Sequence, residues 1–202
     1  QQDPEWVRKW VEEEYPSIAK EAKRLGAAIW FADESGLRSD YHAGTTWGPK
    51  GKTPVVRSTG ARHRLNMLSV VNRQGRMRFM IEKGGVNGEV MCRFLDRLMV
   101  GSSKPVFLIW DGHPTHKSTE VTNKIRSYQG RLRVYLWPGY SPELNTGEGV
   151  WREVKAHRLG RAGVFSFADM KSKALGALRH LAHRPDKIRK LFLTPTTRYA
   201  AQ

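Results

Sequence analysis

The sequence predicts an α/β or α+β domain built on a mixed central sheet, and three features support this fold class. Residues 27–36 read as a buried strand, because their apolar side chains fall on both alternating faces. Further strand-like segments follow, with turn residues before the last of them, as in an antiparallel meander. Helical and strand patterns then alternate through the second half of the chain, which ends in helices.

The expected elements begin with a helix capped by Asp3 and interrupted by Pro16, followed by a second helical stretch over residues 17–25. The expected strands cover residues 27–36, 44–56, 64–72, 75–84, 105–113 and 132–138. The later helices are expected over residues 87–100, 115–128, 142–159, 166–182 and 185–193. At 202 residues the chain fits one domain over residues 27–202, preceded by linker helices over residues 1–26.

The composition predicts a protein that binds nucleic acid. Thirty-five Lys and Arg residues against 19 Asp and Glu give a formal charge of +16, which attracts polyanions such as DNA. Charge alone leaves ribosomal, regulatory and enzymatic proteins open. No apolar run approaches the roughly 20 residues that cross a bilayer, so we expect a soluble protein with no membrane partner. The single cysteine, Cys92, excludes an internal disulfide and fits a reducing cytoplasm.

Two aspartates follow the two most apolar strand-like runs. Asp33 comes after residues 29–32, and Asp111 comes after residues 107–110. A carboxylate at the end of a buried strand is costly unless a cation or hydrogen-bond donors compensate for it. If the two strands are neighbours, both carboxylates can hold one cation. The alternative is that each aspartate only caps a turn, as Asp commonly does before Gly.

A third acid, Glu148, is expected at the third position of a helix whose N-cap is Asn145. Helical spacing places Arg152 and Lys155 on the same face as Glu148, where bases beside a metal-binding acid would hold a DNA phosphate. The alternative is a capping box, in which Glu148 accepts from the Asn145 amide. Three carboxylates suit Mg²⁺ or Mn²⁺, which prefer hard oxygen ligands. Two such ions, about 3.5–4 Å apart, would activate the attacking hydroxyl and stabilise the leaving 3′-oxygen.

Four blocks in this order resemble the DDE transposases of the mariner-like insertion-sequence group. The blocks are WFADESG (30–36), TTWGPKGKTP (45–54), LIWDGHPTHKS (108–118) and LWPGYSPELNTGEGVW (136–151). The intervals also suit the family, since 77 residues separate Asp33 from Asp111 and 36 separate Asp111 from Glu148. Gly112 stands where the family commonly has asparagine, and Thr146-Gly147 replace a pair that usually contains proline.

The resemblance implies a ribonuclease-H-like α/β fold and a two-metal catalytic site formed by Asp33, Asp111 and Glu148. It implies an endonuclease that nicks double-stranded DNA at transposon ends and joins the freed 3′-hydroxyl to target DNA, typically at TA. Family members usually carry helix-turn-helix domains before the catalytic domain and act as homodimers, in this group in the bacterial cytoplasm near the nucleoid. Because the first residue is not methionine, we expect such N-terminal domains to be missing from this chain.

Several other side chains are candidates for DNA contact. They are Trp47, Lys50, Lys52, His116, Lys117, Arg152 and Lys155. An aromatic and a cation can stack on a base and pair with a phosphate, but Trp47 could equally pack an ordinary hairpin, and His116 could serve a turn. We exclude Glu34 from the acid site because it should point to the opposite strand face from Asp33. Asp96 is excluded because it should lie on the solvent face of a helix.

Two other functions remain open at this stage. Another ribonuclease-H-like nuclease would use the same acids and magnesium, although the Tyr-Ser-Pro and Leu-Asn block before Glu148 argues against it. A domesticated DNA-binding protein would keep the fold without turnover, although such a protein need not retain all three acids. His180 and His183 are helical neighbours without a third ligand, so we expect no metal there.

Overall fold

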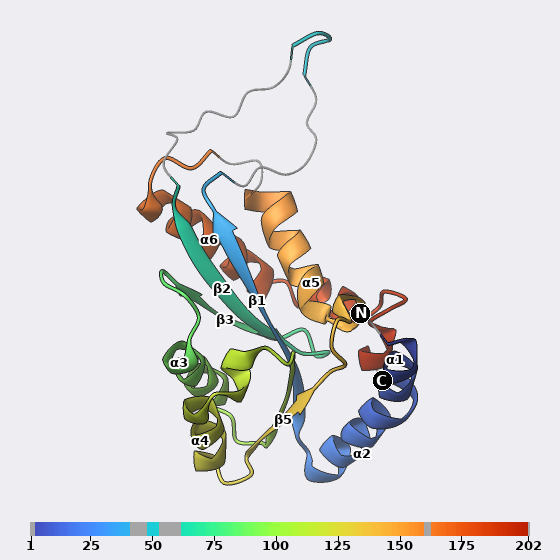
Figure 1. Cartoon of the computed structure of the whole chain (residues 1–202). Coiled ribbons are helices and arrows are strands. Elements are labelled where there is room, and N and C mark those ends of the chain that lie inside the picture. Colours follow the sequence, from blue (N-terminus) through green and yellow to red (C-terminus); the bar gives the residue numbers. More distant parts are fainter. Residues whose placement is uncertain (1–2, 41–47, 53–61, 160–162, 202) are drawn as a thin grey trace.

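The computed structural model describes residues 3–40, 48–52, 62–159 and 163–201. A five-stranded mixed sheet with the order β3-β2-β1-β4-β5 is covered by helices on both faces (Figure 1), which confirms the predicted α/β class. The strands are β1 (Ala28–Arg38), β2 (Arg64–Val71), β3 (Met77–Glu82), β4 (Val106–Trp110) and β5 (Leu132–Leu136). The predicted meander and the later alternation of helices and strands are both present.

Strand β1 pairs with different partners along its length. From Ala28 to Phe31 it runs parallel to β4, and from Phe31 to Arg38 it runs antiparallel to β2. The parallel ladder ends with Phe31 opposite Ile109. Beyond that pair, β1 no longer pairs with β4, which leaves room for a site between the two segments.

The first face of the sheet is covered by α3 (Gly88–Met99) and α4 (Thr119–Ser127). Asn87 and Ser118 cap these helices by accepting from the amides of Val90 and Val121. The side chains expected to face inward from α3 are all buried: Val90, Met91, Phe94, Leu95 and Leu98. The helical periodicity therefore identified the core face of α3 correctly.

The opposite face is covered by the N-terminal helices, α5 (Thr146–Trp151), α6 (Phe167–Ala182) and α7 (Pro185–Lys190). Helix α5 continues into a π-helical segment, η4 (Arg152–Leu159), and three short 3₁₀ turns are also present. These turns are η2 (Pro114–Lys117), η3 (Pro142–Leu144) and η5 (Arg198–Ala201). The two ends of the chain lie close together (Figure 1), and the Tyr15 hydroxyl donates to the Ala200 carbonyl across 3.3 Å.

The expected break at Pro16 is wrong. The chain stays helical from α1 (Pro4–Lys9) through a π-helical turn, η1 (Trp10–Glu14), into α2 (Tyr15–Leu25). Proline lacks an N–H and its ring crowds the carbonyl four residues earlier, which disfavours regular α-helix at that point. The wider turn accommodates it, because the Tyr15 amide donates to the Trp10 carbonyl.

The strand expected over residues 44–56 is not found in its described part. Residues 48–52 contain a turn in which the Lys52 amide donates to the Pro49 carbonyl, with Gly51 at a φ of 79°. The rest of that segment, including Trp47, lies outside the described residues. Among the helices described, none is both long and apolar enough to cross a membrane.

Candidate active site

Asp33 and Asp111 lie at corresponding positions on neighbouring strands. Each stands two residues beyond the last parallel pair, Phe31 and Ile109. Asp111 directly follows β4, as expected. Asp33 does not end its strand, because β2 continues to pair with β1 as far as Arg38. The two aspartates therefore lie where β4 stops and β1 continues, paired with β2 alone.

The Asp33 carboxylate accepts several hydrogen bonds and is largely removed from water. Its Oδ1 accepts from the Glu34 amide at 2.9 Å, and its Oδ2 accepts from the Trp151 indole Nε1 at 2.7 Å. Burial raises the pKa of Asp33 to about 7, and the negative charge of Glu148 adds to this effect against the hydrogen bonds. A carboxylate that is costly to ionise in the apo protein is one that a bound cation would stabilise.

The start of α5 packs directly against Asp33. Asn145 is the N-cap, and its side-chain oxygen accepts from the Gly147 amide at 2.7 Å. A Cβ added to Gly147 would lie 2.2 Å from the Asp33 Cβ, so only glycine fits this position. The Thr146-Gly147 pair, a departure from the family pattern, is thus where the helix contacts the first acid.

Glu148 occupies the third position of α5, as predicted, and its side chain is exposed. The capping-box alternative is not observed, because the Asn145 amide donates instead to the Pro142 carbonyl at 3.0 Å. Lys155 is half-buried in the π-helical segment η4 that continues α5. Burial lowers the pKa of Lys155, while the charges of Glu148 and Asp33 act in the opposite direction. Helix α5 and η4 therefore bring an acid and a base to the same region as Asp33.

Asp111 contacts a buried histidine. His116 Nδ1 lies 2.9 Å from Asp111 Oδ1, and His116 Nε2 lies 2.7 Å from Glu34 Oε1. The ring stacks on Trp110, with centroids 4.3 Å apart. Burial opposes the charge on His116, but the hydrogen bonds to Asp111 and Glu34 prevail and raise its pKa to about 9. The same contact with His116 holds the pKa of Asp111 below its usual range.

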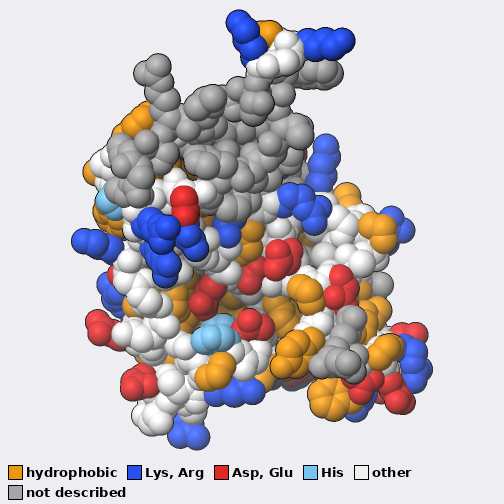
Figure 2. Space-filling model, turned by 45° about the horizontal axis from the view of Figure 1, so that its top comes forward, with side chains coloured by type: hydrophobic (Ala, Val, Ile, Leu, Met, Phe, Trp, Pro, Cys, Tyr) orange, Lys and Arg blue, Asp and Glu red, His pale blue; other side chains and the backbone are white. Residues whose placement is uncertain are grey.

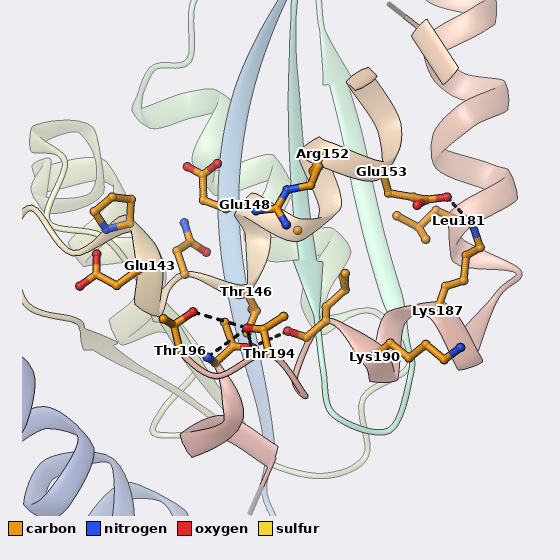
Figure 3. Close-up of a pocket in the computed structure, with 15 residues that line it drawn as sticks. Glu143, Thr146, Glu148, Arg152, Glu153, Leu181, Lys187, Lys190, Thr194 and Thr196 are labelled. Atoms are coloured by element: carbon orange, nitrogen blue, oxygen red, sulfur yellow. Dashed lines mark hydrogen bonds and ion pairs between the residues drawn. The ribbon is translucent and has the colours of Figure 1, made fainter. Parts of the chain in front are cut away.

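Two cavities adjoin these acids. The larger cavity, of about 660 Å³, is lined on one side by Glu148 and Arg152. Its other side is formed by α7 and the segment after it, which contribute Lys187, Lys190 and several threonines (Figure 3). Lys187 pairs with Glu153 across this cavity. A smaller cavity of about 190 Å³ lies between the aspartates and α3. It is lined by Ala32, Asp33, Glu34, Met91, Phe94, Asp111, His113 and His116.

The donor set fits hard divalent cations. In the part of the chain that is described, no three His, Cys, Asp or Glu side chains stand together as a preformed metal site. The oxygen donors nevertheless match the preference of Mg²⁺ and Mn²⁺. Burial, with a smaller contribution from the charge of Glu148, raises the pKa of Asp33, and a bound cation would offset this cost. Asp33, Asp111 and Glu148 would be the residues to hold the ions.

The residues expected to contact DNA differ in accessibility. Lys50, Lys52, Lys117 and Arg152 are exposed, whereas Trp47 lies outside the described residues. His116 is 8% exposed, and both of its ring nitrogens have partners within the protein. His116 is therefore not among the proposed DNA contacts. Figure 2 shows acidic side chains gathered with a histidine in a hollow of one face, with Lys and Arg side chains around them.

Two contacts of the site were missed from the sequence. The indole of Trp151 donates to the Asp33 carboxylate, a contact that the sequence did not predict. Glu34 was excluded as a ligand, but it contacts the histidine that binds Asp111. Glu34 and His116 are 82 positions apart, so no local pattern could pair them. Asn145, in contrast, was identified correctly as a cap.

Comparison with protein families matches residues 28–171 to the DDE superfamily endonuclease model. The chain belongs to this family. The matched region contains all three acids and all five strands of the sheet. No curated protein shows significant sequence similarity to the chain.

Solved structures confirm that this DDE endonuclease domain has the ribonuclease-H-like fold. The catalytic domain of Mos1 mariner transposase is similar with a TM-score of 0.61 at 12% identity, covering 100% of this chain and 97% of that one. The Mos1 mariner paired-end complex with Mn gives 0.64 at 13% identity, with 99% and 64% coverage. The Mos1 paired-end complex with left transposon end gives 0.61 at 14% identity, with 94% and 63% coverage. The chain thus spans less than two thirds of the Mos1 chains in those complexes.

Proposed function

We propose that this chain is the catalytic domain of a cut-and-paste DNA transposase that nicks DNA at transposon ends and joins the 3′-hydroxyl to target DNA. The observation that carries the proposal is the placement of the acids. Asp33 and Asp111 each lie two residues beyond the last pair of the parallel β1–β4 ladder, and Gly147 lets the Glu148 helix pack against Asp33. In a chain of the DDE endonuclease family, this arrangement supports phosphoryl transfer.

The proposed cofactors are two Mg²⁺ or Mn²⁺ ions held by Asp33, Asp111 and Glu148. Bound ions would supply an activated hydroxyl and stabilise the leaving oxygen. The protein's own part is to keep the carboxylates in place. Trp151 and the Glu34 amide orient the Asp33 oxygens, and His116 orients Asp111. Solved Mos1 paired-end complexes with Mn and with Mg are consistent with either metal.

The proposed partner is double-stranded DNA, both transposon ends and target, with TA as the target dinucleotide. Arg152 lines the cavity beside Glu148, and Lys155 lies close enough to interact with the charges of Glu148 and Asp33, so both are proposed to hold the DNA backbone near the metal site. Lys117, Lys50, Lys52 and Trp47 are proposed as further DNA contacts. One of the similar structures is a Mos1 transposase paired-end complex with left transposon end, and a homodimer is proposed for the full-length protein.

The first test is nicking of supercoiled plasmid in Mn²⁺ or Mg²⁺. Asp111→Asn should reduce the nicking rate by at least about 100-fold, because a lost metal ligand removes several kcal/mol of transition-state stabilisation. Asp96→Asn is a matched control, since the side chains of Asp96 and Asp111 are 52% and 53% exposed. That control should nick at the rate of the unmodified chain.

Three results would contradict the proposal. Undiminished nicking by Asp111→Asn would show that the activity comes from elsewhere. DNA binding without any metal-dependent nicking would favour a non-catalytic DNA-binding protein. Faster cleavage of an RNA–DNA hybrid than of duplex DNA would favour another nuclease of the same fold.

A further inference from the structure

We propose that Glu34 and His116 form a bridge that positions Asp111 relative to strand β1, and that this bridge sets the affinity of the site for its divalent cations. The inference rests on the proposed function, because it takes Asp33 and Asp111 as metal ligands. It assigns Glu34 and His116 as positioning residues, neither of which contacts the metal or the DNA.

The bridge consists of hydrogen bonds on both sides of one imidazole ring. His116 Nε2 lies 2.7 Å from Glu34 Oε1. His116 Nδ1 lies 2.9 Å from Asp111 Oδ1 and 3.1 Å from the Asp111 carbonyl oxygen. Because all these partners are acceptors, both ring nitrogens serve as donors. One side chain therefore joins the segment after β4 to the middle of β1.

The ring itself is fixed in place. His116 is 8% exposed and stacks on Trp110 at an interplanar angle of 13°. Its backbone belongs to the η2 turn, in which the His116 amide donates to the His113 carbonyl at 2.9 Å. Because stacking and the backbone turn both hold the ring, it keeps the position of Asp111 relative to Glu34 fixed.

Asp111 needs such a partner more than Asp33 does. Its side chain is 53% exposed and lies just beyond the end of β4, where no strand pairing restrains it. Besides its contact with His116, the Asp111 carboxylate accepts a hydrogen bond from the His113 amide, at 3.0 Å. Glu34, in contrast, directly follows Asp33 and is paired with Leu68 in the sheet. The bridge therefore ties the less restrained acid to the strand that carries the better restrained one.

Partners of this kind have a known range of effects in metalloproteins. Groups that orient a metal ligand without touching the metal typically contribute 10–100-fold to metal affinity. Glu34→Ala removes the acceptor and should fall in that range. Glu34→Gln keeps a carbonyl oxygen at the same reach, so His116 retains its partner. If Glu34 were itself a metal ligand, the Gln variant would lose as much affinity as the Ala variant.

The experiment measures Mn²⁺ binding to the chain by titration calorimetry, without DNA. We expect Glu34→Ala to weaken binding by about 10–100-fold and Glu34→Gln by less than about threefold. His116→Asn retains a donor near Asp111 but does not reach Glu34, and it should weaken binding like Glu34→Ala. In nicking assays, raised Mn²⁺ should restore the rate of Glu34→Ala, an effect that general loss of structure would not give.

Glu82→Ala is the matched control. Glu82 is also a strand glutamate, its side chain is 22% exposed against 26% for Glu34, and it pairs with Arg93 at 2.6 Å. Its removal should lower thermal stability by a similar amount and leave Mn²⁺ affinity unchanged. Circular dichroism of each variant verifies that it is folded at the temperature of the titration.

The outcomes separate the bridge from the proposed function. Unchanged Mn²⁺ affinity in Glu34→Ala and His116→Asn, with binding lost in Asp111→Asn, would overturn the bridge alone. Equal losses in Glu34→Ala and Glu34→Gln would also overturn it, in favour of Glu34 as a ligand. Absence of Mn²⁺ binding in the unmodified chain, or undiminished binding in Asp111→Asn, would instead contradict the proposed metal site.

Discussion

Gly147 determines how closely the Glu148 helix approaches Asp33. A methyl group at this position would lie 2.2 Å from the Asp33 Cβ and 2.6 Å from its Oδ2. The obstructing atom is bonded to the Asp33 backbone, so a change of rotamer cannot relieve the contact. Either the strand or the helix would have to move, and in both cases Asp33 and Glu148 separate.

Gly147→Ala is therefore expected to cost about 1–3 kcal/mol of unfolding free energy, as overpacking does, and to abolish nicking. Gly176→Ala is the control, because a Cβ there meets nothing within 4 Å and α6 is helical on both sides. That change should stabilise the protein by about 0.5–1 kcal/mol. Urea unfolding and plasmid nicking measure both effects, and an active, fully stable Gly147→Ala variant would refute this account.

At the residue scale, the sequence predicted those site residues whose signal is local. Asp33 and Asp111 stood out because each carboxylate followed an apolar run, and Asn145 because of its capping chemistry. The bond from Trp151 to Asp33 depends on how α5 docks on the sheet, which the helical pattern of α5 does not contain. The same holds for the contact between Glu34 and His116, which belong to different elements.

Among the elements, α5 has a cap that serves two purposes. Asn145 accepts from the Gly147 amide, and its side chain also hydrogen-bonds the Asp33 carboxylate, which lowers the pKa of that group. Asn87 caps α3 in the ordinary way, accepting from the Val90 amide at 3.0 Å. Alanine substitutions of the two asparagines can therefore be compared directly.

Asn145→Ala and Asn87→Ala should each lower the unfolding free energy by about 1 kcal/mol, the usual value of an N-cap. Only Asn145→Ala should also reduce nicking and Mn²⁺ affinity, because only Asn145 touches a catalytic acid. Chemical denaturation and calorimetry on the two variants provide the comparison. If both variants kept full activity, the cap of α5 would have no part in the site.

The prediction of elements failed where the backbone departs from regular geometry. The π-helical turn η1 keeps the chain helical at Pro16, where the usual effect of proline had predicted an interruption. Residues 48–52 contain Pro49 and Gly51, which favour a turn, within a segment whose other residues are compatible with a strand. The turn is what forms in this part of the chain. The long apolar strands and amphipathic helices were predicted well, because their burial pattern repeats over many residues.

For the whole molecule, the N-terminal helices are part of the main core. Trp10, Tyr15 and Ile18 are buried, and the Tyr15 ring packs edge-on against Tyr199 with centroids 4.9 Å apart. Tyr15 also lies beside Phe31 of the central strand, at 6.1 Å between centroids. No local pattern in the sequence predicts this contact between the two ends of the chain, because its members lie far apart along the chain.

Deletion of residues 1–26 should leave residues 27–202 unable to fold stably. Each of the three large buried side chains contributes about 1.5–3 kcal/mol, a sum comparable with the total stability of a domain, about 5–15 kcal/mol. Deletion of residues 1–6 is the control, since residues 3–6 are exposed, and it should be tolerated. Thermal melting and solubility distinguish the two. A shortened chain from residue 27 with an unchanged melting temperature would show that the helices are a separable linker.

The change of partner along β1 also has a consequence for how the chain folds. Strands β1, β2 and β3 pair antiparallel with segments that are closer in sequence. The parallel pairing of β1 with β4, in contrast, brings together two segments whose aspartates, Asp33 and Asp111, are separated by 77 residues. The intervening chain must lose conformational entropy on closing this long loop before Asp33 and Asp111 can meet. A chain that has formed only its meander has placed Asp33 in the sheet but cannot bring Asp111 to it, so the proposed metal site forms only once β4 has joined the sheet.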